Sequence, residues 1–159
     1  MENASKALIM AASVLIGIMI LSLAVYLFAT FGASSAQMHE QIQIDRTNQF
    51  NAQFTVYQNM TNITIYDVVT VANTAKNNNE YYGLTTSDES NYYITVQLGN
   101  TYIEGKDDNY FNSLIQSDIN TIQRDPTTGT AKEMPTYTCQ VTISDITGLV
   151  KTVKFTKNN

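Results

Sequence analysis

An uninterrupted run of residues without a charged side chain, Ala7 to Phe31, lies near the start of this 159-residue chain. An α-helix rises about 1.5 Å per residue, so about 20 apolar residues cross a bilayer core of about 30 Å. The run, which we call the span, is therefore long enough to cross a membrane with some tilt. The rest of the chain is polar and patterned like a small folded domain, so the sequence predicts an anchored domain.

The sequence divides into four parts around the span. We expect a short cytoplasmic tail at 1–6, a transmembrane helix at 7–31, a helical extension or stalk at 32–50, and an extracytoplasmic head domain at 51–159. The roughly 125 residues beyond the span are enough for one compact domain. Cationic groups stay preferentially on the cytoplasmic side of a membrane. Because Lys6 and the α-amino group lie close to the span, we expect the N-terminus inside and the head outside the cell.

Charge and cysteine content exclude several classes of function. The chain has 14 acidic and 9 basic residues, and the basic residues are scattered, so nucleic-acid binding is not predicted. One cysteine, Cys139, and one histidine, His39, cannot supply the ligands of a zinc site. We expect Cys139 to be buried and His39 to be solvated. Phosphate-binding glycine loops and nucleophile elbows are absent from the sequence, so we predict no enzymatic activity, cofactor or small-molecule substrate.

Three interpretations of the span remain open. It is a permanent anchor, a cleaved signal peptide with small residues at Ser34 and Ala36 before the cut, or an anchor that also mediates assembly. Ser13, Gly17 and Ala24 fall within about 40° of one another on a helical wheel. Small residues on one face let helices approach closely in lipid. The predicted partners are membrane lipid and, through this face, further copies of the chain or other envelope proteins.

The helix of the span is expected to continue beyond the membrane, from Ala4 to near Asn48. Met38 and Ile42 recur at helical spacing in this extension. The pattern after it is ambiguous. Helical spacing fits Phe50, Phe54 and Tyr57, whereas strand alternation fits Phe50, Ala52, Phe54 and Val56.

Two short helices are expected in the head. Thr64 and Asp67 have the spacing of a capping box, and an apolar helical face comes after it at Ile65, Val68, Val69, Ala72 and Ala75. The asparagines 77–79 are expected to end this helix. Asp107 or Asp108 caps the second helix, whose apolar face comprises Phe111, Leu114, Ile115, Ile119 and Ile122. Asp125 and Pro126 are expected to end it.

Alternating residues predict the strands. The segment Tyr92–Leu98 carries Tyr92, Ile94, Val96 and Leu98 on one face, and Gly99 and Asn100 lead into a short partner strand at 101–104. A hairpin comes later in the chain, with Tyr137, Cys139, Val141 and Ile143 in its first strand, a turn at 145–148, and Leu149, Val153 and Phe155 in its second. The expected fold class is α+β: an N-terminal transmembrane helix continuing into a small domain with two short helices on an antiparallel sheet of about four strands.

Acidic residues suggest a cation site that the sequence leaves undecided. Glu104, Asp107 and Asp108 form the densest group of oxygen ligands, which calcium prefers, but no calcium-loop pattern surrounds them. Helix capping and solvated charge are the alternative explanation. Asp88 and Glu89 are weaker candidates.

Tyrosine pairs are the candidates for surface interaction. Tyr gives a large contact area at low entropic cost, so Tyr81, Tyr82 and Tyr93 are predicted to contact a partner. In the alternative, Tyr92 and one of Tyr81 or Tyr82 pack in the core with the hydroxyl reaching water.

An apolar N-terminal helix that runs into a small α+β head ending in a sheet resembles the type IV pilins and pseudopilins. In those families the helix resides in the membrane and then packs in the core of a filament. The leader-like segment here is MENASKA, and no acidic residue lies in the span, so the resemblance transfers no family residue. The stretches ENASKALIMAASVLIG, QFNAQFTVY and TIYDVVTVAN are similar to small uncharacterised single-pass envelope proteins of Clostridia-like bacteria.

These observations lead to two hypotheses of function. The first is a pilin-like structural subunit or assembly component of the bacterial cell envelope, located in the cell membrane or in an extracellular filament. The alternative is a membrane-tethered extracytoplasmic binding module, accessory to secretion, conjugation or adhesion machinery.

Overall fold

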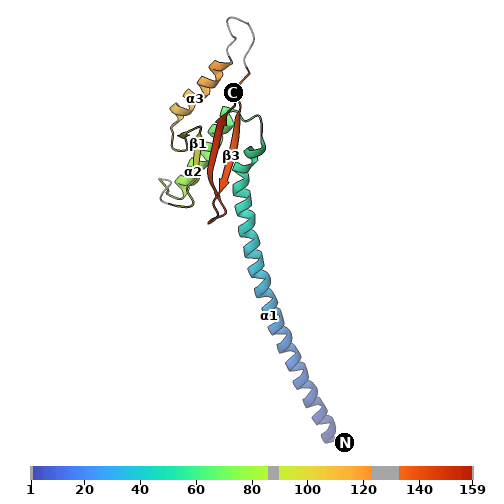
Figure 1. The fold of residues 1–159 in the computed structure, drawn as a ribbon. Coiled ribbons are helices and arrows are strands. Elements are labelled where there is room, and N and C mark those ends of the chain that lie inside the picture. Colours follow the sequence, from blue (N-terminus) through green and yellow to red (C-terminus); the bar gives the residue numbers. More distant parts are fainter. Residues whose placement is uncertain (1, 86–89, 123–132, 159) are drawn as a thin grey trace. The chain divides into compact units, whose positions relative to one another are not determined.

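The computed structural model of the chain describes residues 2–85, 90–122 and 133–158 (Figure 1). It divides into two compact units, Met1–Arg46 and Thr47–Asn159, and we call the second unit the head. The boundary lies four residues before the start of the head expected at position 51. Two predictions lie outside the described residues: the weaker cation-site candidates Asp88 and Glu89, and the end of the second head helix at 125 and 126.

The first helix, α1 (Glu2–Thr55), is longer than the predicted 4–48. It continues through the ambiguous segment, so the helical alternative is correct there, and a 3-10 turn, η1 (Val56–Asn59), comes directly after it. Phe54 is fully buried in the core of the head, with Phe50 and Tyr57 packed against the same core. Burial of this helical stripe is what extends α1 into the head.

The helix α2 (Ile65–Tyr81) begins at the predicted capping box, where the backbone N–H of Thr64 donates to the Asp67 carboxylate at 2.8 Å. The predicted end at the asparagines is wrong, because α2 continues through them. Asn79 faces the core, and its amide exchanges two hydrogen bonds with the backbone of Ile94, of 2.9 and 2.8 Å. Gly83, with a φ of 66°, ends the helix in a left-handed conformation that glycine adopts without strain.

The helix α3 (Asp108–Thr121) is capped by Asp107, whose side chain accepts a hydrogen bond from the N–H of Tyr110 at 2.9 Å. Its predicted apolar face is confirmed in the first half, where Phe111 is 4% exposed. Ile119 and Ile122 are each 36% exposed, and the buried residue in the second half is the acidic Asp118. The inward face of α3 is therefore apolar at one end and polar at the other.

The sheet has four strands in the order β2-β1-β4-β3: β1 (Thr95–Leu98), β2 (Thr101–Tyr102), β3 (Tyr137–Ile143) and β4 (Val150–Lys157) (Figure 1). The predicted β3–β4 hairpin is confirmed as an antiparallel pair. The pairing of β1 with β4 is parallel, so the sheet is mixed rather than wholly antiparallel. The α+β class with two further helices is confirmed.

One hydrophobic core joins the elements of the head. The end of α1, the helices α2 and α3, and the strands β1, β3 and β4 all contribute side chains to it. The fully buried large side chains are Phe54, Ile63, Ile65, Val68, Val71, Ile94, Val96, Ile103, Val150, Val153 and Phe155. A buried amide links two of these elements, because Asn51 of α1 donates to Gly148 O at 2.7 Å and accepts from Val150 N at 2.9 Å. The core therefore holds the helices and the sheet of the head in fixed positions.

Candidate functional site

The span is an exposed apolar surface. Its large apolar side chains are 44 to 79% exposed, and α1 is the helix that is long and apolar enough to cross a membrane in the described part of the chain. The hydroxyl groups of its serine and threonine residues bond to the helix backbone; Ser22, for example, donates to Ile18 O at 2.8 Å and Thr30 donates to Tyr26 O at 2.9 Å. Polar groups satisfied within the helix are compatible with a surrounding of lipid or apolar side chains.

The predicted helix-packing residues share one face of α1, because the helix runs through them without a break. Ser13 and Gly17 are exposed and Ala24 is half-exposed. A Cβ added at Gly17 would meet nothing within 4 Å, and Gly17 has no positive φ. Neither space nor backbone conformation within the chain therefore requires glycine at this position.

The predicted surface tyrosines have different environments. Tyr81 is 83% exposed and Tyr82 is 55% exposed, while Tyr93 is half-buried and its hydroxyl lies 3.5 Å from the Glu104 carboxylate. Tyr92, which the strand pattern placed in the core, is 49% exposed, because β1 begins three residues later than predicted. The alternative in which Tyr92 and one of the pair pack in the core is therefore wrong. Tyr81, Tyr82 and Tyr92 form the exposed group.

The three predicted calcium candidates have separate local roles. Glu104 is 6% exposed and its Oε2 accepts from the N–H of Val96 at 3.1 Å, so solvated charge does not explain it. Asp107 is the cap of α3, and Asp108 is an exposed residue in the first turn of that helix. Within residues 2–85, 90–122 and 133–158, no group of three or more His, Cys, Asp or Glu side chains could hold a metal ion.

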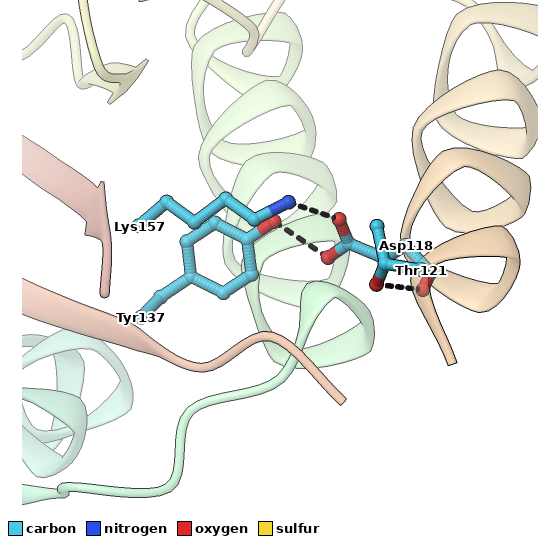
Figure 2. Close-up of polar contacts among 4 residues, drawn as sticks. All are labelled: Asp118, Thr121, Tyr137 and Lys157. Carbon is cyan, nitrogen blue, oxygen red and sulfur yellow. Dashed lines mark hydrogen bonds and ion pairs between the residues drawn. The ribbon is translucent and has the colours of Figure 1, made fainter. Parts of the chain in front are cut away.

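A buried acidic residue, Asp118, is the centre of a polar site in the head (Figure 2). Asp118 Oδ2 accepts a hydrogen bond from the Tyr137 hydroxyl at 2.6 Å, and Oδ1 is paired with Lys157 Nζ at 2.7 Å. Thr121 donates to the backbone carbonyl of Asp118 at 2.6 Å. These contacts tie α3 to β3 and β4 beside a cavity of about 250 Å³ whose lining also includes Leu98.

The chemistry of this site favours a structural connection. Burial, and then the hydrogen bond to the Asp118 carboxylate, raise the pKa of Tyr137 well above its ordinary value of 10.0. The phenol therefore stays protonated at neutral pH and continues to donate. Because both carboxylate oxygens are occupied, Asp118 holds Tyr137 and Lys157 in place rather than presenting a free base.

The single cysteine and the single histidine lie in unlike surroundings. Cys139 is buried, as predicted, and burial raises the pKa of its thiol to about 11. Reactive cysteines require the opposite shift, toward the thiolate. His39 is exposed on α1, as predicted.

Sequence reasoning missed three buried polar residues, Asn51, Asn79 and Asp118. The sequence does contain a signal for two of them, since Asn79 lies four residues after Ala75 and Asp118 seven after Phe111, which are helical core spacings. A polar residue at such a position indicates a buried hydrogen-bonding contact.

Comparisons with known proteins do not assign a function to this chain, so a function is inferred from the residues of the structure. No family model, curated protein or solved structure was found to match this chain.

Proposed function

We propose that the chain is a pilin-like structural subunit or assembly component of the bacterial cell envelope, anchored or polymerised through the span. The observation that carries the proposal is the continuous exposed apolar surface of α1 from Ala7 to Phe31. A contiguous apolar surface of this size requires a lipid or protein partner. The N-terminus lies inside the cell in this proposal, and the head lies outside.

The face made by Ser13, Gly17 and Ala24 supports assembly over simple anchoring. Without a hydrophobic driving force between helices in lipid, association depends on close packing, which small residues allow. The absence of an internal requirement for Gly17 fits a contact with another helix. The resemblance to type IV pilins, whose N-terminal helices pack together in filaments, leads to the same proposal.

Cysteine crosslinking in native membranes tests the assembly. In a Cys139→Ala background, we expect Ser13→Cys, Gly17→Cys and Ala24→Cys to form disulfide-linked dimers on oxidation. Leu15→Cys is the matched control, because a rotation of 100° per residue places it about 180° from Ala24. Electron microscopy of the full-length protein would show ordered multimers.

Two results would overturn assembly through this face: no crosslink at any of the three positions, or equal crosslinking at position 15. A protein that remains monomeric in membranes favours the second candidate function, a single-pass tethered binding module. The specific observation that favours this candidate is the exposed group of Tyr81, Tyr82 and Tyr92. Capture of one stoichiometric partner, lost when these tyrosines are replaced, would support it.

A further inference from the structure

Three exposed tyrosines gather where α2 ends and the chain approaches β1. Tyr81 is the last residue of α2, Tyr82 is its C-cap, and Tyr92 lies three residues before β1. The rings of Tyr81 and Tyr82 meet edge to face with centroids 5.1 Å apart, and those of Tyr82 and Tyr92 are stacked at 6.1 Å. These residues, called the tyrosine cluster, form a continuous aromatic surface.

Amide side chains border the tyrosine cluster. Asn77 and Asn78 each lie four residues before a ring of the cluster on α2, and residues at this spacing are neighbours on a helix surface. Asn91 is exposed and directly precedes Tyr92. An amide side chain both donates and accepts hydrogen bonds, as does a tyrosine hydroxyl. The border therefore offers paired donors and acceptors around the rings.

The size of the cluster fits a small ligand. The rings are 83, 55 and 49% exposed, and an aromatic side chain buries at most about 250 Å², so together they offer less than about 500 Å². A standard protein–protein interface buries about 800 Å² on each partner. The three rings by themselves therefore suit a small ligand, whereas a protein partner would also have to contact residues outside the cluster.

The charge near the cluster fits a neutral ligand. In the last two turns of α2 the charged residues are Lys76 and Glu80, and Lys76 lies about 140° around the helix from Tyr81, away from the rings. A phosphate or sulfate group would lack a cation to pair with there.

We propose that the tyrosine cluster binds a neutral oligosaccharide. The apolar C–H face of a sugar ring packs on the tyrosine rings, and the amides and phenol groups bind the sugar hydroxyls. This binding goes beyond the proposed assembly and does not depend on it, since it uses the head alone of the two compact units.

Binding of defined sugars to the full-length protein tests the proposal. The protein is held in lipid nanodiscs, because alkyl glycoside detergents carry a sugar of their own, and cellotetraose, maltotetraose and chitotetraose are titrated by calorimetry. We expect saturable binding of at least one of them. Tyr82→Ala, which removes the central ring, should weaken it about tenfold, the size of one lost stacking contact. Tyr82→Phe should retain most of the binding.

Tyr66→Ala and Tyr102→Ala are the matched controls, because these tyrosines are 50 and 56% exposed and lie outside the cluster. Both should bind as tightly as the unaltered protein. Failure of all three sugars to bind would overturn the proposal, as would equal weakening by Tyr66→Ala. Crosslinking of the Gly17→Cys protein in native membranes, measured separately, would show that assembly stands although sugar binding fails.

Discussion

The two ends of α1 show how the same helix serves two environments. Phe28, in the span, is 79% exposed, whereas Phe54, near the end of the helix, is fully buried in the core of the head. Both are phenylalanines in continuous helix. Local sequence therefore specifies the helix at both positions, and the surrounding chain decides which ring is covered. The head supplies its own apolar and polar partners, while the apolar surface of the span is exposed.

The largest expected effect separates these two phenylalanines. Phe54→Ala should destabilise the head by about 3–5 kcal/mol, because it removes a fully buried ring and leaves a cavity. Phe28→Ala should leave the stability of the head unchanged. Urea-dependent labelling of Cys139, which is buried and the only thiol, reports unfolding of the head in the full-length protein. Equal loss in both variants would contradict the comparison.

The head also differs from the span in having buried polar side chains, such as Asn79, that hydrogen-bond to its backbone. Asn79→Ala should cost about 2–3 kcal/mol, because the buried N–H and C=O of Ile94 both lose their partner. Asn77→Ala, an exposed position on the same helix, is the matched control and should change stability by less than about 0.5 kcal/mol. The same thiol-labelling measurement applies. A loss at Asn77 as large as at Asn79 would show that the contact with Ile94 is not what causes the loss, because the change from asparagine to alanine improves helix propensity at both positions.

Local patterns predicted the helices well because their signals lie within a few residues. The capping box at Thr64 and the β3–β4 hairpin with its short turn are confirmed, and the cap expected at Asp107 or Asp108 lies at Asp107. Asn79 shows where this reasoning fails. Asparagine weakens a helix by itself, but its contact with Ile94, far along the chain, outweighs that preference.

Pairing between distant strands could not be read from the sequence. Alternation predicts the strands themselves, but β1 could join either edge of the hairpin, and in either direction, with the same apolar face turned inward. The parallel pairing of β1 with β4 depends on how the chain between them packs. Tyr81 and Tyr82 are predicted as surface residues, but Tyr92 was missed for a related reason: it continues the strand alternation in sequence, although the strand begins after it.

Two acidic residues of α3, the buried Asp118 and the exposed Asp108, extend the comparison with a smaller expected loss of stability. Asp118→Asn should lower stability by about 1–2 kcal/mol, because the amide still accepts from Tyr137 but loses its charge partner, Lys157, whose side chain is 45% exposed. Asp108→Asn, in the exposed first turn of α3, should cost less than about 0.5 kcal/mol. Denaturation of the three proteins side by side measures the difference. Equal effects would mean that the buried pair does not stabilise the head.

The smallest expected effect is a loss of stability in alkali that arises in the head. Burial raises the pKa of the Cys139 thiol from 9.0 to about 11. A raised pKa in the folded state gives stability that is complete below the unfolded value and is lost between pH 9 and pH 11 as the unfolded thiol ionises first. By pH 10 the loss is about 1 kcal/mol. Tyr137, with its raised pKa, adds to the loss at still higher pH.

Cys139→Ala separates the thiol from the other titrating groups. The variant is less stable at neutral pH, but its stability should fall less steeply between pH 8 and pH 10 than that of the unaltered protein. Tyrosine circular dichroism follows the unfolding, since it needs no thiol and the chain has 10 tyrosines. Parallel pH profiles in the two proteins would mean that Cys139 is as accessible to hydroxide in the folded head as in the unfolded chain. The head would then be open to water at its sheet, and its contrast with the exposed span would not hold there.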